Sequence, residues 1–169
     1  DQYTALNPND HSYILTMYFD DVYNNGIVVT ISEYSEPLTE WPTEWVAEQV
    51  AEIEAEGTAV PAPTFEGIES YVTLAPAMGY GPVVQVNVDD TELACAAYCA
   101  QLEELGYFVV GDNYGAPLYA LEGETLGISP QLSYDGLFWI ELLPLDEPAV
   151  KPSPIPVITE WPAEELADI

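Results

Sequence analysis

The sequence almost lacks positive charge. Among 169 residues it has one Lys and no Arg against 30 Asp and Glu, which gives a formal net charge of −29. A chain this acidic repels nucleic acid phosphates and anionic lipid headgroups, so neither class is expected as a direct partner. Cationic proteins and weakly bound divalent cations remain open as partners. The carboxylates must be solvated, capped by backbone N–H groups or neutralised by bound cations, because almost no basic side chain can pair with them.

The scarcity of Lys and Arg also bears on proteolysis. Trypsin-like enzymes cleave after Lys or Arg but poorly before Pro, and the only candidate bond joins Lys151 to Pro152. Three explanations stay open: selection in a protease-rich lumen such as a gut, a trypsin-resistant piece of a longer chain, and compositional drift in an acidic secreted protein. The first two are compatible, and both predict a protease-resistant surface.

Cysteine, histidine and long apolar runs are also scarce. Cys95 and Cys99 lie four residues apart in a predicted helix, and no further Cys or His completes a zinc set. This spacing places both on one helical face but orients their Cβ atoms poorly for a disulfide, so two buried thiols are favoured over a disulfide or a metal pair. No apolar run reaches the roughly 18 to 20 residues that span a bilayer. No signal peptide is expected, because Asp1 opens a polar stretch.

Residues for catalysis are missing as well. The sole imidazole, His11, stands beside Ser12 in a predicted loop, where an exposed histidine is favoured over a catalytic one. No G-x-S-x-G, H-E-x-x-H or P-loop motif occurs, and no Arg is present to bind phosphate. Thirty acids bring carboxylates together by chance, so a carboxylate-pair glycoside hydrolase is kept only as an unfavoured alternative. We predict a non-enzyme without catalytic residues or a cofactor.

One loop resembles the beginning of a calcium site. The run D-V-Y-N-N-G from Asp21 matches the start of an EF-hand, but Tyr23 takes a ligand position and Ser32 replaces the bidentate Glu. A hairpin is the favoured interpretation, and no dedicated metal site is predicted. Weak divalent binding stays open at three acidic clusters, Asp20-Asp21, Asp89-Asp90 with Glu92, and Asp146-Glu147.

What the chain does contain is a series of strand-like segments rich in β-branched and aromatic residues. Asn25-Gly26 is a strong turn signal between the first two of them and predicts a hairpin. The expected strands are 13–19, 27–34, 67–74, 83–88, 107–110, 117–122, 125–133 and 136–144.

Two helices are expected between these strands. The first begins at Trp41-Pro42 and ends at Gly57, with Val46, Val50 and Ile53 as its apolar stripe. The second helix follows a capping box, Asp89-Asp90-Thr91-Glu92, and is closed by Gly106. Its predicted core face is Cys95, Tyr98, Leu102 and Leu105. The predicted fold is α+β, with helices packed on one face of an antiparallel sheet.

Internal similarity predicts that this fold is arranged as tandem repeat units. Thr39-Glu40-Trp41-Pro42 recurs as Thr159-Glu160-Trp161-Pro162, and Asp1, Tyr3, Ala5, Tyr23 and Gly26 match Asp112, Tyr114, Ala116, Tyr134 and Gly136. The expected divisions are the C-terminal half of one unit (1–36), a complete unit (41–146), a Pro-rich linker (147–158) and the opening helix of another unit (159–169).

The order of parts resembles a family of uncharacterised domains in secreted proteins and lipoproteins of gut-dwelling Firmicutes. That family opens with a W-P helix and a Pro-punctuated segment, followed by strands, a Y-x-x-x-L-x-x-x-G-[FY] helix and a β meander. The matching residues, within about 41–144, are Trp41, Pro42, Pro61, Pro63, Tyr98, Leu102, Gly106 and Tyr107. The chain departs from the family in lacking cations. The resemblance implies an exported, luminal or cell-surface protein and supplies no functional residue.

Aromatic residues offer the remaining functional clue. Exposed Tyr and Trp side chains suit a sugar-binding platform or a protein interface. The recurrence of Trp41 as Trp161 favours core packing, and Trp139 lies in a strand that is apolar on both faces, hence central or covered by a neighbouring unit.

These observations favour a noncatalytic secreted or cell-surface repeat module that acts in adhesion, spacing or self-assembly. Its expected partners are further copies or another surface protein, with no membrane insertion. The main alternative is a secreted binding or inhibitor module whose acidic face captures a cationic protein.

Overall fold

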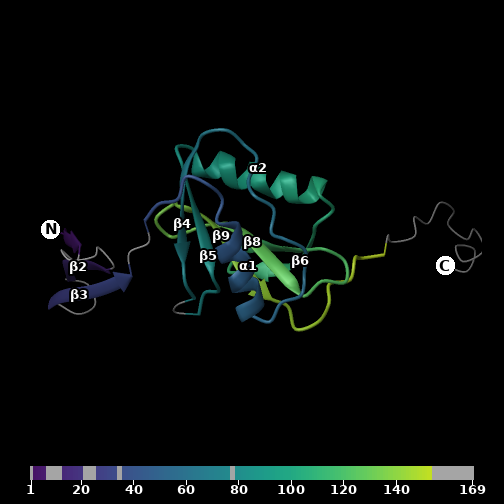
Figure 1. The fold of residues 1–169 in the computed structure, drawn as a ribbon, viewed down its shortest axis with the longest axis horizontal. Coiled ribbons are helices and arrows are strands. Elements are labelled where there is room, and N and C mark those ends of the chain that lie inside the picture. Colours follow the sequence, from purple (N-terminus) through teal and green to yellow (C-terminus); the bar gives the residue numbers. More distant parts are fainter. Residues whose placement is uncertain (1, 7–12, 21–25, 34–35, 77–78, 154–169) are drawn as a thin grey trace, which may run out of the picture.

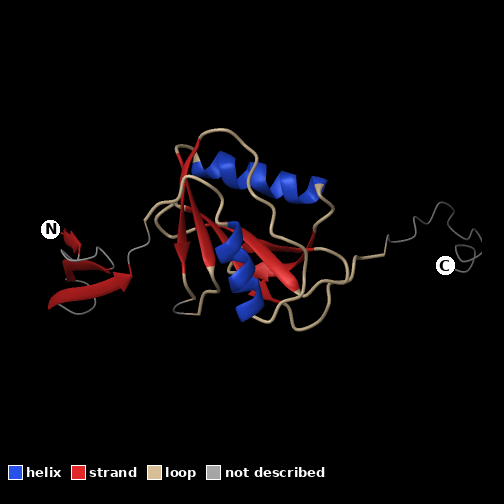
Figure 2. Cartoon of the chain, viewed as in Figure 1, coloured by secondary structure: helices blue, strands red, loops and turns tan. Residues whose placement is uncertain are grey.

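The structure, a computed structural model, describes residues 2–6, 13–20, 26–33, 36–76 and 79–153. These residues form a three-stranded sheet, a six-stranded sheet and two helices (Figures 1 and 2). The elements are β1 (Gln2–Leu6), β2 (Tyr13–Asp20), β3 (Gly26–Glu33), α1 (Thr43–Glu52), β4 (Ile68–Leu74), β5 (Val83–Val88), α2 (Thr91–Glu104), β6 (Phe108–Asn113), β7 (Ala116–Ala120), β8 (Leu126–Leu132) and β9 (Phe138–Pro144).

The first sheet is an antiparallel meander in the order β1-β2-β3. β2 and β3 pair from Tyr13–Glu33 to Asp20–Gly26, which confirms the predicted hairpin, although its turn lies outside the described residues. β1 was not predicted, because Q-Y-T-A-L is short and carries no β-branched run.

The second sheet has the order β4-β5-β9-β8-β7-β6, and every neighbouring pair is antiparallel. This confirms the α+β class and the antiparallel sheet. β9 lies between β5 and β8, so the strand that carries Trp139 is central. The edge strand β4 is joined from outside by Leu38, whose N–H and C=O both bond to Tyr71 at 2.8 Å.

Both helices pack on the same face of this sheet. Side chains from α1, such as Val46, and from α2, such as Tyr98, share one core with alternate residues of the strands, including Val84, Ile128 and Ile140. Figure 2 shows the two helices lying over the sheet, with the irregular segment 53–67 joining α1 to β4. The opposite face carries the intervening residues and is called the helix-free face below.

Each residue of the Y-x-x-x-L-x-x-x-G-Y pattern has a structural role in or just after α2. Tyr98 and Leu102 are fully buried, and the Tyr98 hydroxyl donates to the Pro61 carbonyl at 2.7 Å. Gly106 has φ +93°, and the bonds Gly106 N to Glu103 O and Tyr107 N to Leu102 O form a Schellman end, as predicted. The predicted core position of Leu105 is wrong, because it is the C-cap residue and is largely exposed.

The predicted ends of two helices need correction. α1 stops at Glu52 rather than at Gly57, because Glu54 takes φ +55° and the bonds Glu54 N to Ala51 O and Ala55 N to Val50 O close the helix. The lack of a side chain at Gly57 instead allows close packing, because a Cβ there would lie 2.8 Å from the Cβ of Leu126. α2 is capped by Asp90, whose carboxylate accepts from Leu93 N, one residue after the predicted Asp89.

The β6–β7 hairpin leaves the plane of the sheet. A bulge interrupts it between Val109 and Gly111, and β7 pairs with β8 only at Tyr119–Ile128. Beyond the bulge the hairpin covers part of the helix-free face, where Leu118 lies against Gly127 of β8. As a result β8 is buried along its whole length except at Leu132.

The chain that follows β9 stays attached to the unit at first. Ala149 is buried, its N–H donates to the Glu124 carbonyl, and its own carbonyl accepts from Gly123 N. The Pro-rich linker therefore begins pinned to the β7–β8 connection. Residues 154–169, including the predicted opening helix, lie outside the described part.

Candidate functional site

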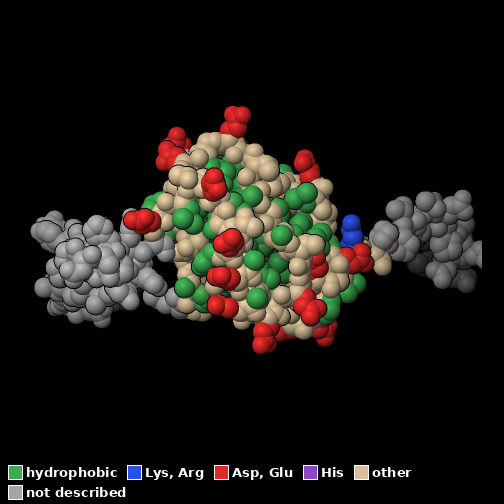
Figure 3. Space-filling view, in the orientation of Figure 1, with side chains coloured by type: hydrophobic (Ala, Val, Ile, Leu, Met, Phe, Trp, Pro, Cys, Tyr) green, Lys and Arg blue, Asp and Glu red, His purple; other side chains and the backbone are tan. Residues whose placement is uncertain are grey.

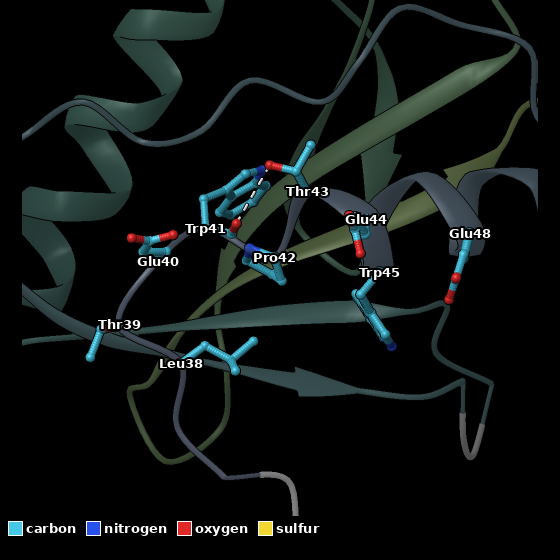
Figure 4. A pocket seen from close by; sticks show the side chains of 9 residues that line it. All are labelled: Leu38, Thr39, Glu40, Trp41, Pro42, Thr43, Glu44, Trp45 and Glu48. Atoms are coloured by element: carbon cyan, nitrogen blue, oxygen red, sulfur yellow. Dashed lines mark hydrogen bonds between the residues drawn. The ribbon is translucent and has the colours of Figure 1, made fainter.

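An open groove of about 690 Å³ lies where the chain enters α1. Its lining combines indole rings and carboxylates from one short segment, namely Leu38, Thr39, Glu40, Trp41, Pro42, Thr43, Glu44, Trp45 and Glu48 (Figure 4). Figure 4 shows the Trp45 ring and the Glu48 side chain pointing to the same side of α1. We call this the entry groove.

Local bonding fixes the shape of the entry groove. Pro42 is the N-cap residue, with φ −78° and ψ 62°, and its carbonyl accepts the first helical bond from Val46 N at 2.9 Å. Thr43 N bonds back to Trp41 O at 2.8 Å, which turns the chain into the helix. The Trp41 ring meets Tyr71 of β4 edge-on, with centroids 5.5 Å apart. Trp41 is thus partly buried against the core, as its recurrence predicted, and it anchors the groove.

The electrostatics of the entry groove are wholly acidic. Glu40, Glu44 and Glu48 are all exposed, and Glu44 lies in the first turn of α1, where it complements the helix dipole. Exposed carboxylates beside indole rings suit cationic groups, which gain Coulomb attraction and cation–π contact together. They lack the apolar enclosure of a general acid, so the groove gives no support to a glycosidase.

A second arrangement, missed by sequence reasoning, surrounds Glu141 on β9. This carboxylate is fully buried and accepts three hydrogen bonds: Gly81 N to Oε1 at 2.6 Å, Asn113 Nδ2 to Oε2 at 2.8 Å and Gln131 Nε2 to Oε2 at 2.6 Å. The donors come from the β4–β5 loop, the end of β6 and β8. Glu141 therefore holds the β6–β7 hairpin against the sheet. The only sign of this role in the sequence is a single acidic residue within the apolar run F-W-I-E-L-L.

Cys95 and Cys99 are free thiols on α2. Both are half-buried rather than fully buried, because they lie beside the buried stripe of Ala94, Tyr98 and Leu102. A hydrogen bond from the Cys95 thiol lowers the pKa of Cys99, burial raises it, a contact with Tyr119 lowers it and the Glu103 carboxylate raises it, with a net value of about 7. The same hydrogen bond, together with burial, raises the pKa of Cys95.

The thiol pair yields a testable pH profile. We expect one thiol, Cys99, to react with iodoacetamide with a rate that rises through a midpoint near pH 7, well below the usual thiol pKa of about 8.5. Cys95→Ala should move this midpoint upward, since it removes the hydrogen bond that stabilises the Cys99 thiolate. The rate is measured by mass spectrometry of labelled peptides; a wild-type midpoint near 8.5 would contradict the assignment.

The structure leaves several predicted residues untested. His11, Ser12 and the loop from Asp21 to Asn25 lie outside the described residues. Lys151 and Pro152 are exposed, and Figure 3 shows carboxylates scattered over the visible face of the described residues. Within the described ranges, no three metal-ligating side chains form a cluster. The helices described are too short or too polar to cross a membrane.

Comparison of the chain with protein-family models, curated proteins and solved structures found no match. The resemblance to secreted Firmicutes domains stays a prediction.

Proposed function

We propose that the chain belongs to an array of tandem units that works noncatalytically outside a bacterial cell, in adhesion, spacing or self-assembly. One observation carries the proposal. β2 and β3 form one antiparallel pair and β8 and β9 form another, at positions related by the sequence match of Tyr23 and Gly26 to Tyr134 and Gly136. Thr-Glu-Trp-Pro follows both strand pairs, at 39–42 and 159–162.

The contact of Leu38 with β4 supports a continuous array. After β3 the chain adds Leu38 to the outer edge of β4 and enters α1 within five residues. This covers part of an edge that would otherwise offer unpaired N–H and C=O groups to other chains. Each unit of such an array would thus be closed by the segment that arrives from the unit before it.

Self-assembly is tested by light scattering after size-exclusion chromatography. In the meander β1–β3, β3 pairs with β2 alone within the described residues, whereas the matching β9 also pairs with β5. We expect oligomers to grow with protein concentration and with salt, because salt screens the repulsion between chains of net charge −29. A monomer at every concentration and ionic strength would remove self-assembly from the proposal.

Protease resistance gives a sharper prediction. We expect trypsin to leave the chain intact, and Pro152→Ala to introduce one cut after the exposed Lys151, giving residues 1–151 and 152–169. Gel electrophoresis and mass spectrometry follow the products over time. Pro148→Ala is the matched control, since it changes a nearby proline without altering the Lys–Pro bond. A rapid tryptic cut in the wild type would argue against selection for resistance.

The entry groove favours a second candidate, capture of a cationic protein. Its Glu40, Glu44 and Glu48 side chains are free in solvent beside Trp45. A Lys-rich peptide should then bind with an affinity that falls steeply with salt, opposite to the salt dependence of self-assembly. Glu44→Gln with Glu48→Gln should weaken binding, whereas Glu69→Gln on β4 should not.

A further inference from the structure

Three aromatic rings meet on the helix-free face, where no function has yet been placed. Tyr80 precedes β5, Tyr114 forms the tip of the β6–β7 hairpin and Trp139 lies on β9. The centroid of Tyr80 is 5.8 Å from that of Tyr114 and 5.9 Å from that of Trp139. The rings come from segments far apart in sequence, so the fold and not local spacing brings them together.

Core packing does not explain why an aromatic residue occupies position 114. Tyr114 has φ +53° and is 79% exposed, and Gly115 follows with φ +90°. Two-residue hairpin turns with positive φ strongly favour Asn-Gly, and a residue other than Gly held there costs about 1 kcal/mol or more. Tyr80 is also exposed, at 42%. An aromatic ring at a strained turn position, open to solvent, points to contact with a ligand.

A row of neutral polar side chains continues from this corner. Gln85 on β5 stands directly opposite Trp139 in the strand pairing. Its Nε2 donates to Asn87 Oδ1 at 2.7 Å, and Asn87 Nδ2 donates to Ser70 Oγ on β4 at 2.8 Å. These bonds orient both amides, and they leave each amide a second N–H to donate. All three residues are partly exposed.

The chemistry of this patch selects its ligand. Tyr80, Tyr114, Trp139, Gln85, Asn87 and Ser70 are all uncharged, within a chain of net charge −29 that repels anions. Two carboxylates adjoin them: the exposed Asp112 accepts a hydrogen bond from Gly115 N at 3.0 Å, and the buried Glu141 already accepts three hydrogen bonds. Aromatic faces stack on the C–H face of a sugar ring, and oriented amides exchange hydrogen bonds with its hydroxyl groups. We propose that this aromatic and amide patch binds a neutral glycan.

This inference goes beyond the tandem array, because the patch lies within residues 70–139 of one unit. A chain that is monomeric can still bind a glycan, and an array can form without one. The two proposals therefore fail separately: light scattering tests the array, and glycan binding tests the patch.

The experiment is affinity electrophoresis of the full chain in gels that contain soluble glucan, mannan, galactan or xylan. We expect at least one of these neutral polysaccharides to retard the chain equally in 50 and 500 mM salt, and anionic polygalacturonate to have no effect. Tyr114→Gly should reduce the affinity at least tenfold without lowering the thermal midpoint, because Gly suits the positive φ. The control is Tyr134→Ala, which removes another fully exposed tyrosine, in the β8–β9 turn.

Three results would overturn the proposal. One is the absence of retardation by every neutral polysaccharide in the panel. Another is retardation that Tyr114→Gly leaves unchanged, or that Tyr134→Ala reduces to the same extent. The third is dimerisation that Tyr114→Gly abolishes in a chain that no glycan retards, since the patch would then be a contact between copies.

Discussion

Gly81→Ala is expected to lower the free energy of unfolding by about 3–5 kcal/mol, one of the two largest effects of a single substitution in this chain. A Cβ at residue 81 would overlap sterically with the carbonyl oxygen of Leu142. That atom belongs to the backbone of central strand β9 and cannot rotate away. The loop would have to move and would weaken two bonds, Gly81 N to Glu141 and Leu142 N to Pro82 O.

Gly111→Ala on β6 is the matched control for this substitution. Gly111, like Gly81, has no left-handed φ, but the nearest atom to its Cβ would be Leu118 Cδ2 at 3.9 Å, an ordinary contact. Alanine there should be neutral or slightly stabilising, because it restricts the unfolded chain. Urea unfolding followed by circular dichroism measures both variants. Equal stability losses at the two positions would contradict a steric origin at Gly81.

The sequence was sufficient for elements whose signals are local. The apolar stripe Val46, Val50 and Ile53 does face the core, and Gly106 does end α2. These features depend on residues within one or two helical turns of each other. The strand pairing β2–β3 was likewise predicted, because a strong turn signal separates two adjacent β-rich segments.

The sequence predictions were wrong where residues far apart in the chain determine the local structure. Gly57 was predicted to end the first helix, yet its small size serves packing against Leu126, 69 residues later. The exit from α1 instead uses Glu54 in a left-handed conformation, for which the sequence carries no Gly or Asn signal. The fold-over of the β6–β7 hairpin also had no local sign.

The candidate sites divide in the same way. The entry groove comes from one continuous segment, residues 38–48, and its Trp-Pro motif was evident in the sequence. By contrast, the donors to Glu141 lie 60, 28 and 10 positions away from it. Tyr80, Tyr114 and Trp139 are equally scattered. Such arrangements follow from the order of strands in the sheet, which local patterns do not specify.

The second large prediction concerns Glu141 itself. Glu141→Leu should lower the free energy of unfolding by about 3–5 kcal/mol, because three donors lose their shared acceptor in a fully buried place. Glu69→Leu on β4 is the control: Glu69 is exposed, and its replacement should change stability by no more than about 0.5 kcal/mol. Urea unfolding again supplies the measurement. A loss at residue 141 as small as at residue 69 would mean that the network contributes little.

Glu141→Gln separates the charge of this side chain from its hydrogen-bonding pattern. Gly81 N belongs to the backbone and can only donate, so it must face the new amide oxygen. The new NH₂ group then meets Asn113 and Gln131, whose side-chain amides can turn over and present their oxygens instead. We expect a loss of about 1–2 kcal/mol, less than for leucine, because neutral amides replace charge-assisted bonds.

The coupling free energy between substitutions at residues 81 and 141 separates two causes of the Gly81→Ala effect. One is steric overlap of the new Cβ with Leu142, and the other is a weakened bond from Gly81 N to Glu141. In a Glu141→Leu background the Gly81 N–H has no carboxylate to bind, so Gly81→Ala should cost less there than in the wild type. We expect the two losses to differ from additivity by about 0.5–3 kcal/mol. Strict additivity would assign the whole effect of Gly81→Ala to its overlap with Leu142. Non-additivity would place the β4–β5 loop and the buried carboxylate in one unit, which holds Tyr80 beside Trp139 and Tyr114 at the proposed glycan patch.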